Sequence, residues 1–153
     1  MTDPIVKTID VDCPAADAFD VFVSRIGAWW PLNRFAASAR DGKAALDATI
    51  EPRVGGAVYE TMHDGGRDDW GEVLVFDPPP AYACTWHPGN NKANPTRVDV
   101  AFKDLGTGRC RVTLTHSGWE AWAEQADEAR AGYDGGWATV FEEKYAGACA
   151  ALV

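Results

Sequence analysis

Apolar and polar residues alternate with a period of two in several segments of the chain, which is typical of β-strands that bury one face. The residues between these segments favour turns: Asp64-Gly65-Gly66 and Gly106-Thr107-Gly108 indicate hairpins, and Pro78-Pro79-Pro80 cannot continue a ladder of backbone hydrogen bonds. Consecutive strands joined by hairpins form an antiparallel sheet. We predict strands over Ile5–Val11, Leu46–Glu51, Ala57–His63, Trp70–Phe76, Ala81–His87, Thr96–Leu105 and Arg109–His116.

The period changes to that of an α-helix in two places. Pro14 and Asp17 are typical of a helix start, and apolar residues follow at helical spacing up to Trp30, with a second short helix or a corner before Pro31. The second helical pattern begins after Gly118 and predicts a long C-terminal helix. Gly135-Gly136 predicts a bend or a close backbone approach within this helix. Its stripe consists of Ala129, Tyr133, Trp137, Val140, Phe141, Lys144, Tyr145 and Ala148.

These elements predict an α+β fold: a curved antiparallel sheet of about seven strands around a long C-terminal helix, with two short helices after the first strand. The 153 residues are enough to bury a sizeable core, and without a visible repeat or linker we expect residues 1–153 to form one domain. No segment approaches the roughly 20 apolar residues of a membrane span. The first residues do not resemble a secretory signal, so we expect a cytoplasmic protein.

Charge and motifs narrow the classes of function. The net charge of −9, from 23 acidic and 14 basic residues, opposes binding to nucleic acid or to an anionic membrane. The four cysteines show no CxxC spacing, the three histidines are scattered and no HExxH occurs, so we expect no metal and no cofactor. No serine lies in a GxSxG motif, so nothing identifies an enzyme from a known catalytic motif.

Two carboxylates break the alternation of the strands in an informative way. If Val58 and Met62 face the C-terminal helix, Glu60 faces it too, and the same reasoning from Leu74 and Phe76 turns Glu72 inward. A buried carboxylate needs a proton, a cation, an N–H donor or water. Glu60 therefore has either a role in a pocket or a structural role, such as accepting a hydrogen bond from a tryptophan. A shift of one residue in register would place Glu72 in solvent.

The aromatic residues on the same faces have two interpretations. They either fill the core or line a hollow that a strongly curved sheet closed by one helix leaves open. His116, at the end of its strand, is either a pocket donor or a hydrogen-bonded core residue. The residues that we expect at a ligand site are Glu60, Trp70, Glu72, Trp86, Phe102, His116, Tyr133, Trp137 and Phe141.

Several motifs occur in an order that resembles the START/Bet v1-like (SRPBCC) superfamily, and within it the branch named after the activator of Hsp90 ATPase. The resemblance covers almost the whole chain and implies a helix-grip fold with a cavity between sheet and helix. It places Glu60, Trp70, Trp86, His116 and Trp137 at motif positions, and it transfers no catalytic residue. The motifs are Phe19–Pro31, Ile50–Gly56, Val58–Glu60, Trp70–Leu74, Asp77–Pro79, Thr85–Trp86, Thr115–Trp119 and Tyr133–Trp137.

Three functions compete on this fold. The first is binding of a small apolar or aromatic molecule in the internal cavity. The second is an enzyme of the cyclase or hydrolase type, using Glu60 with His116 or Glu72 as acid and base. The third is a co-chaperone-like module for a partner protein, which needs an exposed apolar patch. A homodimer through Trp29, Trp119 or Trp122, if these are exposed, is left open.

Overall fold

The computed structural model describes residues 2–88 and 93–152. Within these residues, seven antiparallel strands form a curved sheet in the order β1-β7-β6-β5-β4-β3-β2. Every neighbouring pair except β1–β7 joins strands that are consecutive in the chain, as the hairpin signals predict. The strands are β1 (Ile5–Val11), β2 (Asp47–Ile50), β3 (Ala57–Thr61), β4 (Arg67–Asp77), β5 (Ala81–Trp86), β6 (Thr96–Gly106) and β7 (Arg109–Ser117).

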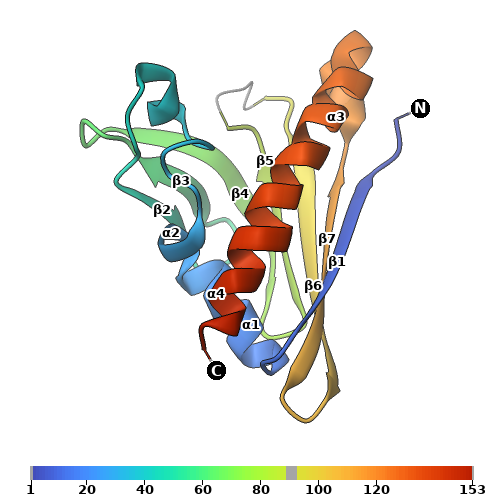
Figure 1. Cartoon of the computed structure of the whole chain (residues 1–153). Coiled ribbons are helices and arrows are strands. Elements are labelled where there is room, and N and C mark those ends of the chain that lie inside the picture. Colours follow the sequence, from blue (N-terminus) through green and yellow to red (C-terminus); the bar gives the residue numbers. More distant parts are fainter. Residues whose placement is uncertain (1, 89–92, 153) are drawn as a thin grey trace.

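The helices lie where the sequence predicts them. Helices α1 (Ala15–Ser24) and α2 (Ile26–Trp29) follow β1, and the C-terminal helix continues from α3 (Ala126–Trp137) through the π-helical η3 (Ala138–Tyr145) into α4 (Ala146–Ala150). Figure 1 shows this helix lying across the curved sheet, with α1 near its C-terminal end. The arrangement confirms the α+β fold with a long helix held by a seven-stranded sheet.

The two faces of the sheet follow the predicted alternation in β6 and β7. Val98, Val100 and Phe102 are buried in β6, and the buried residues of β7 run from Cys110 through Leu114 to His116. Residues between them, such as Arg97 and Arg111, are exposed and pair with aspartates. The apolar face therefore packs against α1 and the C-terminal helix and forms one continuous core.

Strand β4 departs from simple alternation, and the prediction that Glu72 faces inward is wrong. The register of β4 shifts against β5 between Val73 and Val75, so that Val73 and Phe76, which pair with the buried Cys84 and Tyr82, are three positions apart and Glu72 is exposed. Just before this bulge Gly71 lies close to β5, since a Cβ atom there would lie 1.8 Å from the carbonyl oxygen of Thr85. One extra residue thus turns the Glu72 carboxylate away from the core.

Two short 3-10 helices were not predicted: η1 (Ala37–Asp41) and η2 (Trp119–Gln125). Trp29 and Trp119 are buried in the core, so neither offers an exposed surface for the homodimer that the sequence leaves open, and Trp122 is half-buried. Across residues 2–88 and 93–152, no helix has the length and apolar character to span a membrane.

Candidate ligand-binding site

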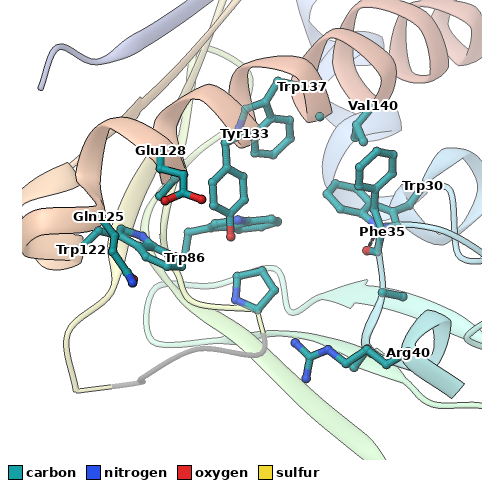
Figure 2. A pocket seen from close by; sticks show the side chains of 16 residues that line it. Trp30, Phe35, Arg40, Trp86, Trp122, Gln125, Glu128, Tyr133, Trp137 and Val140 are labelled. Carbon is teal, nitrogen blue, oxygen red and sulfur yellow. Dashed lines mark hydrogen bonds between the residues drawn. The ribbon is translucent and has the colours of Figure 1, made fainter.

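A cavity of about 530 Å³ lies between the first half of the C-terminal helix and the segment that follows α2. Figure 2 shows Tyr133 and Trp137 projecting from the helix on one side, with Trp30 and Phe35 opposite. The polar side chains Arg40, Gln125 and Glu128 lie at its rim. The lining residues are Trp30, Phe35, Ala36, Ala37, Arg40, Trp86, Pro88, Trp122, Gln125, Glu128, Ala129, Gly132, Tyr133, Gly136, Trp137 and Val140.

Trp30, Trp86 and Trp137 form the aromatic wall of this cavity, and Trp70 packs behind it. The Trp30 ring lies 5.0 Å from that of Trp70, 5.8 Å from that of Trp86 and 6.0 Å from that of Trp137, between ring centroids. Such pairs contribute about 0.5–1.5 kcal/mol beyond the apolar area they bury. Trp30 also donates its indole N–H to the carbonyl oxygen of Phe35 at 2.8 Å. The rings therefore pack against one another without a bound molecule.

His116 lies behind this wall and holds it through a directed chain of hydrogen bonds. Trp137 donates its indole N–H to His116 Nδ1 at 3.0 Å, so Nδ1 must be unprotonated and the ring proton of neutral His116 is on Nε2. Nε2 then donates to Thr96 Oγ1 at 2.7 Å, and the Thr96 hydroxyl donates to the Trp86 carbonyl oxygen at 3.1 Å. His116 thus connects the two pocket residues Trp86 and Trp137.

Burial keeps His116 neutral. Its side chain has no exposed surface, and desolvation lowers its pKa from 6.5 to about 3. The Trp119 ring packs on the imidazole with centroids 4.3 Å apart, and Tyr133 meets it edge-on at 4.9 Å. Of the two interpretations from the sequence, the structure places His116 as a hydrogen-bonded core residue adjacent to the pocket.

Glu60 is also fully buried, and its carboxylate binds three N–H donors. Trp70 donates its indole N–H at 3.0 Å, and the backbone N–H groups of Ala37 and Ser38 donate at 2.5 Å and 3.3 Å. This is the structural role considered from the sequence, with Trp70 as the tryptophan partner. Because Ala37 lines the cavity, Glu60 fixes the start of η1 and with it one side of the pocket.

This arrangement predicts that Glu60→Gln lowers the free energy of unfolding by about 1–3 kcal/mol, because the amide NH₂ would face N–H donors and leave one of them unpaired. Urea denaturation followed by tryptophan fluorescence measures the change. Glu72→Gln is the matched control, since the same substitution on the exposed side of the sheet should change stability by less than about 0.5 kcal/mol. Equal effects of both substitutions would contradict the role assigned to Glu60.

The structure distributes the nine predicted site residues over four places. Trp86, Tyr133 and Trp137 line the cavity, while Glu60, Trp70 and His116 lie directly behind its wall. Phe102 and Phe141 are buried in the core and do not line the cavity: the Phe102 ring packs on Phe19, and the Phe141 ring stacks on Tyr145. The side chain of Glu72 is exposed on the outer face of β4.

Much of the lining was not predicted from the sequence. Phe35 and Arg40 come from the irregular segment between α2 and β2, and Trp122 comes from η2, where no periodic pattern indicates a buried face. Trp30 was predicted only as the end of a helical stripe. The one available signal was the number of tryptophans, seven in the chain, which suggests a thick core or a lined cavity.

Metal chemistry finds no support in the part of the chain that the structure describes. Within residues 2–88 and 93–152, no group of three or more His, Cys, Asp and Glu side chains is placed to hold a metal ion. The four cysteines are buried thiols, and desolvation raises the pKa of Cys84 to about 12 and that of Cys110 to about 11. Such thiols behave as small apolar side chains.

A curved sheet around a long C-terminal helix, with an aromatic pocket between them, defines the helix-grip class of the SRPBCC superfamily. The chain belongs to the family described as Activator of Hsp90 ATPase homolog 1-like protein, whose model matches residues 12–144. No curated protein sequence matches the chain.

Solved structures extend the comparison. The chain is 26% identical to the anthrahydroquino-gamma-pyrone synthase Txn09 complexed with SUM, with 99% of this chain and 97% of that chain covered and a TM-score of 0.64. The self-sacrificing resistance protein CalC from Micromonospora echinospora is 20% identical to this chain. The match covers 96% of this chain and 94% of CalC, with a TM-score of 0.71. An HSP90 activator from Plasmodium falciparum is 20% identical to this chain. The match covers 76% of this chain and 74% of the activator, with a TM-score of 0.53. The last two likenesses show the fold alone.

Proposed function

We propose that the protein binds a small, flat, largely aromatic molecule in the cavity between the C-terminal helix and η1. The observation that carries this proposal is a preformed cavity of about 530 Å³ whose walls include Trp30, Trp86 and Trp137. Ligand pockets in proteins measure roughly 300–1,000 Å³ and are mostly apolar, with a few polar groups that orient the ligand. The tryptophan rings offer flat apolar faces to a ligand. Arg40, Gln125 and Glu128 at the rim are the polar groups that would orient it.

The aromatic wall also contains an unsatisfied donor. Trp86 is 6% exposed, and within the described residues its indole Nε1 is buried without an acceptor. A buried donor without a partner costs about 1–3 kcal/mol, and native proteins contain few of them. Because Nε1 has almost no accessible surface, only a shift of the Trp86 ring would bring this N–H to a bound molecule, whose oxygen acceptor would then remove the cost.

An enzymatic role is the second candidate, and the likeness to a synthase at 26% identity over almost the whole chain favours it. That relative is an anthrahydroquino-gamma-pyrone synthase, and a fused ring system agrees with the flat ligand proposed here. The acid–base pair of Glu60 and His116 does not suit this role, because both side chains are buried behind the wall with their hydrogen-bonding atoms engaged. A cyclase at this site would act by shaping its substrate and by the groups at the rim.

The structure offers less support for a protein-interaction module. The large apolar side chains that are exposed among the described residues are Val6, Leu46, Val54 and Leu152, and they belong to four separate segments. A docking surface needs a contiguous apolar patch. We therefore do not extend the partner named for the family to this chain.

Filling the cavity tests the proposal. Gly136 lines the pocket, and a Cβ atom there would make an ordinary contact of 3.5 Å with the Phe35 ring, so larger side chains extend into the cavity. We expect Gly136→Leu to weaken binding of anthraquinone-2-carboxamide at least about tenfold, which corresponds to about 1.4 kcal/mol. Quenching of tryptophan fluorescence measures the affinity. Replacing a helical glycine stabilises the helix by about 0.5–1 kcal/mol, so the variant should fold.

Gly135→Leu is the matched control, because Gly135 is the preceding residue of the same helix, is exposed and does not line the cavity. It should bind the probe like the unmodified protein. If neither probe binding nor quenching is seen with the unmodified protein, or if both leucine variants bind equally well, the proposed site is wrong.

A further inference from the structure

The two rims of the cavity carry opposite charge. Residues 34–43, which include η1, contain three cationic residues and one carboxylate. Residues 119–128, which include η2 and the start of α3, contain four carboxylates and no cation. The protein as a whole has a net charge of −9, so the positive rim is a local exception. The charge at the pocket mouth is therefore positive on the side of residues 34–43 and negative on the side of residues 119–128. A bound molecule with one charged end would be oriented by this difference.

Several charged side chains near the mouth are engaged in contacts within the protein. The Arg34 guanidinium lies over the Phe35 ring, 4.9 Å from its centroid. Asp127 accepts a hydrogen bond from Thr2 at 2.6 Å, and Arg130 donates to the backbone carbonyl oxygens of Asp3 and Pro4. These groups are paired within the protein and are not available to a bound molecule.

Arg40 and Glu128 differ, because both line the cavity and neither forms an ion pair or hydrogen bond within the residues that the structure describes. Figure 2 shows them at opposite ends of the pocket, on either side of the aromatic rings. The side chain of Arg40 is exposed, and its guanidinium presents five N–H donors in a planar fork. This geometry matches a carboxylate, which accepts two parallel hydrogen bonds from it.

We infer that the ligand is an aromatic acid, a flat ring system whose carboxylate pairs with Arg40 and whose other end lies toward Glu128. The inference rests on the proposed function and specifies the chemistry of its ligand. Glu128 contributes by repulsion, because an acid group at its end of the pocket would meet a like charge. One orientation of the molecule is thereby favoured over the reverse.

Two probes that differ only in charge test this assignment: anthraquinone-2-carboxylate and anthraquinone-2-carboxamide. Arg40→Gln should weaken binding of the carboxylate about three- to tenfold, a range set by the partial exposure of the arginine, and change binding of the carboxamide less than about twofold. Salt should weaken binding of the carboxylate to the unmodified protein and leave the carboxamide unaffected. Arg34→Gln is the matched control and should bind both probes normally, since Arg34 does not line the cavity.

Glu128→Gln should bind the carboxylate as well as the unmodified protein or up to about threefold better, because a like charge is removed. Equal losses for both probes in Arg40→Gln, or a loss for the carboxylate in Glu128→Gln, would overturn the assignment of an acid at Arg40. Those results would leave the proposed function intact, provided that Gly136→Leu still blocks both probes. Absence of binding by either probe would instead contradict the proposed function itself.

Discussion

Replacing His116 with alanine should lower the free energy of unfolding by about 3–5 kcal/mol. The imidazole is completely buried, so its removal leaves a cavity, and truncation of a large core side chain alone costs about 2–5 kcal/mol. The substitution also leaves the Trp137 indole N–H without its acceptor, which adds about 1–3 kcal/mol where the site cannot relax. Urea denaturation near neutral pH, followed by circular dichroism, measures the loss.

Two further variants test whether the loss comes from the hydrogen bonds of His116. Thr113→Ala changes the opposite face of the same strand, where Thr113 meets Thr8 in β1, and should alter stability by less than about 0.5 kcal/mol. His116→Gln keeps an acceptor and a donor and should recover part of the loss. A loss below about 1 kcal/mol in His116→Ala would contradict the bracing role of the imidazole between Trp137 and Thr96.

The order of elements and the inward faces of β6 and β7 were predictable because the two physical periods are strong there. A strand with a core on one side and solvent on the other must alternate, and Val98–Phe102 and Cys110–His116 do so without interruption. The stripe through Tyr133 and Trp137 likewise placed the C-terminal helix over that face. These patterns depend only on local geometry and burial, which a single sequence contains.

The bulge in β4 was not predictable in the same way. Alternation placed Glu72 inward, yet β4 has one extra residue against β5 between Val73 and Val75, and the carboxylate turns outward next to Gly71, whose backbone lies close to Thr85. The signal is a single glycine inside a strand, which indicates a bulge or a close contact without stating which. The contact partner, Thr85, lies fourteen residues further along the chain, and only the fold brings the two together.

The polar residues predicted to lie in the concavity turned out to support the pocket from behind. Glu60 organises the N-terminal end of η1, and His116 fixes Trp137 and the backbone of Trp86. From alternation alone, a side chain that faces a hollow and one that braces its wall look the same, because both point inward. The side chains that reach the cavity rim, Arg40 and Glu128, come from segments whose direction depends on that bracing.

Lowering the pH from about 7 to about 4 should destabilise the protein through His116 by about 3 kcal/mol. Desolvation lowers the pKa of His116 in the folded protein to about 3, whereas an unfolded histidine titrates at its ordinary value of about 6.5. A proton on Nδ1 would also face the N–H of Trp137. Between these two pKa values the unfolded chain binds the extra proton, so stability falls with decreasing pH at about 1.4 kcal/mol per unit.

Carboxylates contribute acid sensitivity of the same sign, and Asp10 is one of them because its hydrogen bond with Arg111 lowers its pKa. His116→Gln separates the two sources, since it keeps every carboxylate and removes only the imidazole. The difference in unfolding free energy between the two proteins, measured by urea denaturation at several pH values, should be constant above about pH 7 and shrink steadily below about pH 6. A difference that did not change with pH would mean that the pKa of His116 in the folded protein equals its ordinary value, and it would contradict the desolvation assigned to the buried imidazole.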